Sequence, residues 1–318
     1  MTAKRPLALL LNLTVLAAFA AAVEHWWGWS RLLTPWRQIA LPTLALALLG
    51  MLASYGLRAL RIYVAEQDIP RGAYFGCLRL ILINNALNLI LPARSGEASF
   101  PILMRRWFGI DTARAAGTLI WLRLLDLQVL ATLAAACAAA GWLGAASALS
   151  MFAWAGALLA AVAPLLLFFL RRPIAAKLAG HDGRIAALLS RVLGGLPTRV
   201  TGLLFDLTLT WTAWSVKLLA LAWVLSRLAG FKLVSGMLGA IGGDLSTVLP
   251  LHAPGGFGTY EAGVLALLSP IAAPSGALLA AAVNLHLLIL TTALLSGALA
   301  WLLGGRAQPA VTPADAKL

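Results

Sequence analysis

Long apolar stretches with almost no charged residues recur along this chain from end to end. A helix needs about 20 apolar residues to cross the hydrocarbon core of a bilayer, where its backbone must be hydrogen-bonded internally. Six stretches reach about this length, at residues 7–24, 38–63, 113–141, 147–170, 201–226 and 275–303. Only 11% of the 318 residues are charged, against about 25% in soluble domains. The sequence predicts an all-α polytopic integral membrane protein with about six full transmembrane helices, residues 1–318 forming a single membrane domain.

Two further regions are apolar but too short or too interrupted for a comfortable crossing. One covers residues 73–104 and is broken near residue 92; the other covers residues 233–272 and is broken near residue 254. In each region we expect the chain to enter the membrane and to leave it on the same face. We therefore expect two re-entrant pairs of broken helices.

The basic residues give the expected orientation of the chain. Lysine and arginine concentrate in cytoplasmic loops next to the ends of spans. We expect a cytoplasmic N-terminus, a return to the cytoplasm at Arg58 and Arg61, and a basic cytoplasmic connection at residues 171–199. Residues 304–318 then form a cytoplasmic, polar and Pro-rich tail that we expect to be disordered.

The order of spans and breaks is the same in two halves of the chain, residues 7–141 and 147–303. Each half consists of two spans, a broken pair and one long span, and matching spans are offset by about 160 residues. The first half begins inside and the second begins outside. This pattern indicates an inverted repeat, an architecture found in many secondary transporters.

The formal net charge of +13 has its explanation in this topology. In a soluble protein such an excess would favour a nucleic-acid partner. Here the basic residues lie mostly in short connections, where they orient spans and contact anionic headgroups. The two cysteines have no metal-ligand spacing. We expect no nucleic-acid partner, no metal and no cofactor.

Ionisable residues inside the apolar regions are the candidate site residues, because each costs about 2.5–3.5 kcal/mol at the centre of a membrane helix. The first group lies in the stretch NNALNLILPARSGE, residues 84–97. Pro92 and Gly96 interrupt the helix there. The candidate headgroup-binding residues of this stretch are Asn85, Asn88, Arg94 and Glu97.

The second group lies on two long spans. Arg123 and Asp126 are three residues apart in WLRLLD, so both face one side of a helix. Two interpretations are open: a structural ion pair that neutralises itself, or the wall of a cavity in which Arg123 can bind phosphate. Lys217 lies near the middle of its span and is a further candidate. Asp206 lies near the cytoplasmic end of that span, where we expect a solvated interfacial residue.

The third group lies in the second break, LPLHAPGGFGTYEAG, residues 249–263. Prolines stop a helix here, and glycines let the backbone turn and approach a ligand closely. These structural breaks are Pro250, Pro254, Gly255, Gly256 and Gly258. Glu261 falls in the first turn of a following helix. It either only caps that helix, or it marks helix N-termini that face an anion such as phosphate.

Catalysis finds little support in the sequence. Four histidines are scattered, and no serine, histidine and acid can be placed together. We interpret His286 as a hydrogen-bonded packing residue, and we assign no catalytic residue.

Taken together, the motifs resemble one membrane protein family. NNALNLILPARSGEASFPILMRRWFGID, then WLRLLD, then LPLHAPGGFGTYEAG are similar to the lysylphosphatidylglycerol synthase transmembrane family, also called flippase-like proteins. The resemblance covers nearly the whole chain and matches the breaks and the Arg123–Asp126 pair in order. His252 departs from the family pattern, which has proline at that position.

The resemblance implies a lipid translocase in the bacterial cytoplasmic membrane rather than an enzyme. In bifunctional relatives the membrane domain flips aminoacylated phosphatidylglycerol and a soluble synthase domain makes it; this sequence resembles a standalone member. The implied substrates are aminoacylated phospholipids, polyprenyl-phosphate sugars and related glycolipids. Arginines would then bind the phosphate, while Glu97, Asp126 and Glu261 hold these cations in place or pair with a headgroup amine.

Two other functions are left open by the sequence. The protein could act as a membrane enzyme on a lipid headgroup. It could also be a non-transporting partner of a membrane glycosyltransferase or another lipid-modifying enzyme. The sequence does not give the oligomeric state.

Overall fold

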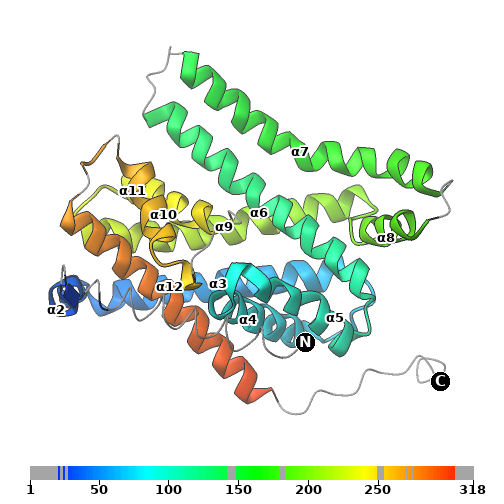
Figure 1. Cartoon of the computed structure of the whole chain (residues 1–318), viewed down its shortest axis with the longest axis horizontal. Coiled ribbons are helices and arrows are strands. Elements are labelled where there is room, and N and C mark those ends of the chain that lie inside the picture. The colour runs from blue at the N-terminus through cyan, green and yellow to red at the C-terminus, as the bar shows by residue number, and fades with distance from the viewer. Residues whose placement is uncertain are drawn as a thin grey trace.

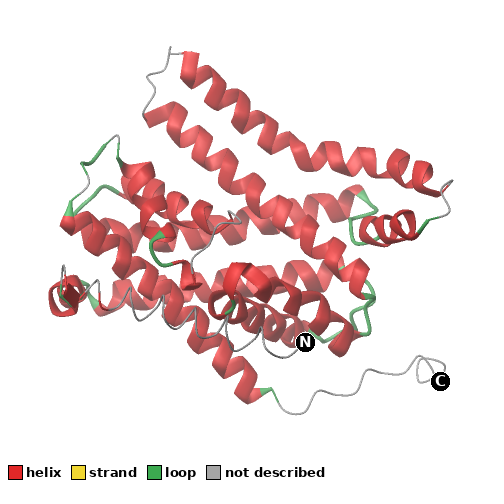
Figure 2. Ribbon diagram, viewed as in Figure 1, coloured by secondary structure: helices red, strands yellow, loops and turns green. Residues whose placement is uncertain are grey.

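The computed structural model describes residues 21, 24–25, 28–141, 148–179, 183–248, 254–269, 271–273 and 275–304, with side chains except at 38, 92–94, 137–141, 148–150, 179, 248 and 254. Within these ranges the chain is helical and has no strand (Figure 2). The elements are α2 (Trp29–Leu32), η1 (Thr34–Gln38), α3 (Leu41–Ala65), α4 (Tyr74–Ile90), η2 (Pro92–Ala98), α5 (Ser99–Phe108), α6 (Thr112–Gly141), α7 (Ala148–Ala179), α8 (Arg184–Leu193), α9 (Val200–Ala229), α10 (Leu233–Val248), η3 (Pro254–Gly256), α11 (Thr259–Leu268) and α12 (Gly276–Leu303).

Helices of membrane-crossing length confirm the predicted class of protein. Among the described residues, five helices are long and apolar enough to span a bilayer: Leu41–Ala65, Thr112–Ala136, Met151–Leu178, Val200–Ala229 and Gly276–Leu303. Each coincides with a predicted full span. The remaining predicted span, residues 7–24, and the predicted tail lie almost entirely outside the described residues. The chain is a multi-pass α-helical membrane protein.

The basic connection predicted at residues 171–199 differs from the structure. Helix α7 continues to Ala179, and α8 follows it, so most of this segment is helical. Arg171 is only 8% exposed, and its guanidinium donates hydrogen bonds to the carbonyls of Phe168 and Thr198. The guanidinium of Arg171 is hydrogen-bonded to backbone carbonyls, and α7 can therefore continue past this charged residue. The hydropathy pattern had indicated the end of the span there.

Helix α7 lies at the edge of the molecule beside α6, and the remaining long helices pack below it (Figure 1). Its large apolar side chains at Met151, Phe152, Leu158 and Phe169 are between 67% and 74% exposed. Soluble monomers rarely expose apolar patches of that extent. This face has the surface expected of a helix in contact with lipid.

The core is built from pairs of helices taken from the two halves of the chain. Helix α3 packs along α9, α4 packs along α12, and α10 packs on α6. Small residues bring the pairs close: a Cβ at Gly50 would meet Ala220, and one at Gly297 would meet Ala86. Van der Waals packing through small residues is the main source of helix association in membranes.

Both broken regions contain short helices, as the sequence predicts, and residues 249–253 of the second region lie outside the described residues. Helix α4 ends at Ile90 and leads through η2 into α5. In the second region α11 begins after Gly258, whose φ of 81° favours glycine. Helices α10 and α11 pack directly on each other, and a Cβ at Gly242 would collide with the carbonyl of Gly263.

Substitution of Gly242 by alanine should separate α10 from α11, because the methyl group meets backbone that cannot move aside. We expect a loss of about 1–3 kcal/mol of stability, measured as a lower thermal unfolding midpoint in detergent. Gly156→Ala in α7 is the matched control, since a Cβ there meets nothing within 4 Å. Equal unfolding midpoints for the two variants would contradict the packing described for α10 and α11.

Candidate functional site

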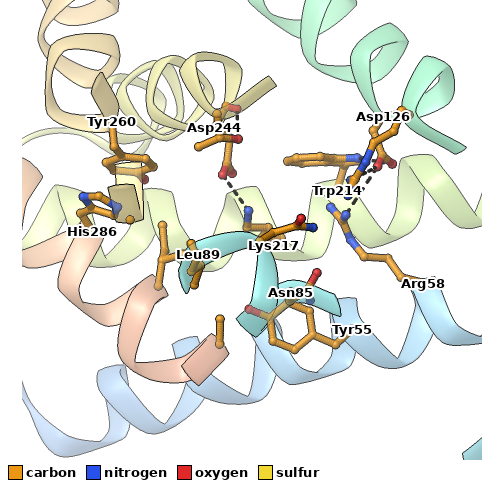
Figure 3. Close-up of a pocket in the computed structure, with 16 residues that line it drawn as sticks. Tyr55, Arg58, Asn85, Leu89, Asp126, Trp214, Lys217, Asp244, Tyr260 and His286 are labelled. Carbon is orange, nitrogen blue, oxygen red and sulfur yellow. Dashed lines mark hydrogen bonds and ion pairs between the residues drawn. The ribbon is translucent and has the colours of Figure 1, made fainter. Parts of the chain in front are cut away.

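A cavity of about 140 Å³ lies at the centre of the described helices, where α3, α4, α6, α9, α10, α11 and α12 meet. Its polar and aromatic walls are unusual for the interior of a membrane protein. The residues on these walls are Tyr55, Arg58, Asn85, Asn88, Arg123, Asp126, Trp214, Lys217, Asp244, Thr247, Tyr260 and His286 (Figure 3). We refer to this space as the central cavity.

One carboxylate in the wall of the central cavity gathers three guanidinium groups. Asp126 is 3% exposed. Its Oδ1 lies 3.2 Å from Arg61 Nη1, and its Oδ2 lies 3.6 Å from Arg58 Nη1 and 3.3 Å from Arg123 Nη1. The indole of Trp214 donates a further hydrogen bond to Oδ1 at 3.0 Å. Because these residues come from α3, α6 and α9, the cluster ties three helices together.

A second carboxylate reaches this cluster from the first break. Glu97 Oε1 lies 3.0 Å from Arg123 Nε. The break is fixed by Asn84, whose side-chain amide donates to the carbonyl of Gly96 at 3.3 Å and to Ser99 Oγ at 2.9 Å. Among the described side chains of this cluster, three guanidinium groups face two carboxylates, which leaves one positive charge in excess within the cluster.

A separate ion pair lines the cavity between α9 and α10. Lys217 Nζ lies 2.7 Å from Asp244 Oδ1; Asp244 is buried and Lys217 is partly buried (Figure 3). Lys217 and Arg58 also lie over the Trp214 ring, at 5.0 Å and 4.5 Å from its centroid. A cation over an indole face is stabilised by the ring quadrupole. Trp214 therefore holds the guanidinium group and the ammonium group on neighbouring sides of the cavity.

The second break supplies a buried acid, Glu261, which pairs with a histidine on α12. Glu261 Oε2 accepts a hydrogen bond from the Gly258 backbone N–H at 2.7 Å, which caps α11. Its other oxygen lies 2.7 Å from His286 Nδ1. Tyr260 stacks on His286 with ring centroids 4.5 Å apart. Glu261 is thus both a helix cap and the partner of a histidine that lines the cavity, and His286 is hydrogen-bonded as predicted.

The family of the chain follows from a comparison that covers almost all of these elements. The family model described as "Lysylphosphatidylglycerol synthase TM region" matches residues 9–297. The chain belongs to this family. No curated protein and no solved structure matches the chain.

The structure of this lysylphosphatidylglycerol synthase TM region brings most of the predicted site residues together. Asn85, Asn88, Arg123, Asp126 and Lys217 line the central cavity. Two more reach it through a partner: Glu97 through Arg123, and Glu261 through His286. Arg123 and Asp126 form an ion pair in the cavity wall, but two further arginines share the Asp126 carboxylate, so the pair does not neutralise itself; phosphate binding by Arg123 stays a prediction.

The structure describes only some of the residues that were predicted to break the helices. Gly255 lines the central cavity, and with Pro254 and Gly256 it forms the short turn η3. Pro250 and His252 lie outside the described residues, as do the side chains of Pro92 and Arg94. Arg94 stays a predicted headgroup residue.

One prediction about a single residue is wrong. Asp206 is not a solvated interfacial residue, since it is 3% exposed and accepts a hydrogen bond from Trp121 at 2.8 Å. Arg58 and Arg61, which we expected to mark the return of the chain to the cytoplasm, lie on α3 within the predicted span, and their side chains are 12% and 4% exposed. In each case a partner on another helix holds the polar group inside.

Sequence reasoning did not assign Tyr55, Arg58, Arg61, Trp214 and Tyr260 to the site. Arg58 and Arg61 are three residues apart, the same spacing that identified Arg123 and Asp126. That spacing was a usable signal for the two arginines. Trp214 could not be distinguished from an interfacial tryptophan, because its partner Asp126 is 88 residues away in the sequence.

Replacement of Asp126 by asparagine should destabilise the protein strongly, because it leaves three guanidinium groups facing one another. Removing one partner of a buried ion pair costs about 3–5 kcal/mol. The unfolding midpoint in detergent should fall accordingly.

The control for this variant lies on the same helix. Gln128 is 5% exposed, and its Oε1 has no hydrogen-bond partner among the described residues. Gln128→Met should be neutral or slightly stabilising. An Asp126→Asn protein as stable as Gln128→Met would show that the carboxylate does not hold the cluster.

Proposed function

We propose that this protein moves a phosphate-bearing lipid across the membrane, with the headgroup held in the central cavity. The observation that carries the proposal is the convergence of Arg58, Arg61 and Arg123 on the single carboxylate of Asp126, with one positive charge in excess after Glu97 is counted. Positive charge that exceeds the negative charge beside it is costly at membrane depth. An anionic ligand would remove that cost.

Phosphate suits the arginine groups better than a carboxylate or a halide does. A guanidinium presents a planar fork of N–H donors that matches phosphate oxygens with two parallel hydrogen bonds. Arg58 Nε is buried and has no hydrogen-bond partner among the described residues. The amides of Asn85 and Asn88 on α4 line the same space and add donors for headgroup oxygens.

The size of the cavity supports a headgroup rather than a whole lipid as the occupant. A volume of about 140 Å³ is roughly ten times the space that one water needs on the same measure. This accommodates a phosphate with a small substituent, while the acyl or polyprenyl chains stay in the bilayer. The substrates that fit are an aminoacylated phospholipid, a polyprenyl-phosphate sugar or a related glycolipid.

The helix pairing supports transport by two related halves. Exchanging the halves converts the α4–α12 pair into the α10–α6 pair and leaves the α3–α9 pair unchanged. This is the pattern of contacts expected of an inverted repeat with two re-entrant broken pairs at a central site. In the proposed orientation the protein lies in the bacterial cytoplasmic membrane with both termini in the cytoplasm, and a lipid-modifying enzyme or glycosyltransferase supplies or uses the lipid.

One observation favours a second candidate, an enzyme that acts on the headgroup. His286 lines the central cavity and is oriented by Glu261 at 2.7 Å, an arrangement that suits a general base. The arginine cluster would bind the headgroup in either function, so it does not distinguish the two candidates. The two candidates differ in whether the lipid leaves chemically changed.

Arg58→Gln and Arg123→Gln should each slow lipid translocation in proteoliposomes by at least about tenfold, the effect of losing one charged hydrogen bond. The rate is measured with fluorescent phosphatidylglycerol and a membrane-impermeant quencher. Arg184→Gln on the exposed face of α8 is the control and should retain the wild-type rate. Wild-type rates in both cavity variants, with intact folding, would rule out this site.

The enzyme hypothesis is tested by the product. We expect mass spectrometry of the lipids recovered from wild-type proteoliposomes to show the same species that were added. His286→Gln should then change the translocation rate without changing lipid composition. A new lipid species that disappears in His286→Gln would establish the enzyme instead of the translocase.

A further inference from the structure

A second cavity, of about 350 Å³, lies where the end of α3 meets the start of α6 and the connection between α8 and α9. Glu66, Arg114, Trp121, Arg199 and Asp206 are among the residues that line it. The basic residues of this end place it on the cytoplasmic side in the proposed orientation. It shares no lining residue with the central cavity.

Asp206 differs from every other buried acid in the part of the chain that the structure describes. The five buried acids and the basic groups within 4 Å of them are Glu66 with Arg114, Asp126 with three arginines, Asp244 with Lys217, Glu261 with His286, and Asp206 with none. Its side chain has a neutral partner, the indole N–H of Trp121, at 2.8 Å. A buried carboxylate without a cation beside it is costly to keep charged.

Asp206 is connected to the central cavity through Arg61. Thr210 lies one turn further along α9, and its hydroxyl donates a hydrogen bond to the backbone carbonyl of Asp206 at 2.6 Å. Arg61 Nη1 donates both to that hydroxyl and to Asp126 Oδ1. The guanidinium of Arg61 therefore lies between a carboxylate of the central cavity and the residue that lines the second cavity.

We propose that Asp206 is a proton-binding site, and that its protonation is coupled through Arg61 to anion binding in the central cavity. The carboxylate takes a proton from water in the second cavity and returns it to that water. The coupling rests on the proposed function, because it requires an anionic headgroup at the arginine cluster. The proton site itself does not.

The sign of the coupling follows from the charges. When Asp206 is neutral, Arg61 stays on Asp126 and the central cavity keeps its excess positive charge. When Asp206 is ionised, it competes with Asp126 for Arg61 and draws that charge toward the second cavity. Anion binding and proton uptake therefore favour each other, and by linkage each raises the affinity for the other.

Other charged groups lie near enough to contribute to this equilibrium. Glu66 at the C-cap of α3, Arg114 on α6 and Arg199 just before α9 line the second cavity with Asp206. Arg61 on α3 and Asp126 on α6 lie beyond Thr210, and Arg171 on α7 bonds the Thr198 carbonyl of the cavity wall. Glu66 and Arg114 neutralise each other at 2.8 Å, and Arg171 is held by backbone carbonyls. On α10 and α12, which also pack against α9, Asp244 and His286 line the central cavity instead. Arg199 is exposed to solvent, whereas Arg61 is 3% exposed, so Arg61 is the buried cation that responds to Asp206.

The proton site is tested on the protein alone by infrared spectroscopy. Wild-type protein should gain a carboxylic-acid C=O band as the pH is lowered. Asp206→Asn, in which the amide oxygen can still accept from Trp121, should lose that band. Glu66→Gln, which removes the other acid of the second cavity, should retain it. Absence of the band in the wild type, its persistence in Asp206→Asn, or its loss in Glu66→Gln would overturn the assignment.

The coupling is tested by calorimetric titration with dihexanoyl phosphatidylglycerol in buffers of different ionisation enthalpy. Wild-type protein should take up protons on binding, and its affinity should rise by up to about tenfold per pH unit as the pH falls. Asp206→Asn should bind with an affinity that does not depend on pH. Wild-type binding without proton uptake would refute the coupling. No wild-type binding at any pH would contradict the proposed function, and infrared titration would then decide the proton site by itself.

Discussion

The carboxylate of Asp126 is the interaction on which the rest of the site depends. It accepts from Trp214 on α9 and neutralises guanidinium groups from α3 and α6, so three long helices meet on its two oxygens. Without it, the arginines of an apolar body would repel one another at short range. With it, they form a stable cluster that still carries more positive than negative charge. That imbalance explains how one feature can hold the helices together and also attract an anion.

The two helix breaks convert this cluster into a cavity. In the first, the Asn84 amide holds the Gly96 carbonyl, and the turn that results brings Glu97 to Arg123. In the second, the positive φ of Gly258 starts α11 so that Glu261 caps the helix and reaches His286. Irregular backbone at membrane depth is tolerated where it is buried in protein or lines a cavity. Both breaks meet that condition through named side-chain partners.

Much of this arrangement could be predicted from the sequence, and what could not has a physical reason. Hydropathy located the five described spans, and the spacing of Arg123 and Asp126 placed them on one face. The sequence predicts a solvated Asp206 and gives Arg58 and Arg61 only a role in topology, because a charged residue near the end of a span looks the same whether it faces water or protein. Only contacts between distant segments separate the two cases. His286 was correctly expected to be hydrogen-bonded, but the identity of Glu261 as its partner depends on how α11 packs on α12.

The account is tested most directly by a structure of the protein in lipid nanodiscs that contain an anionic phospholipid. It predicts a headgroup phosphate in the central cavity, within hydrogen-bond distance of Arg58 and Arg123, with the acyl chains extending into the bilayer. A phospholipid bound only at the outer surface of the helices, with Arg58 and Arg123 contacting protein groups alone, would contradict it.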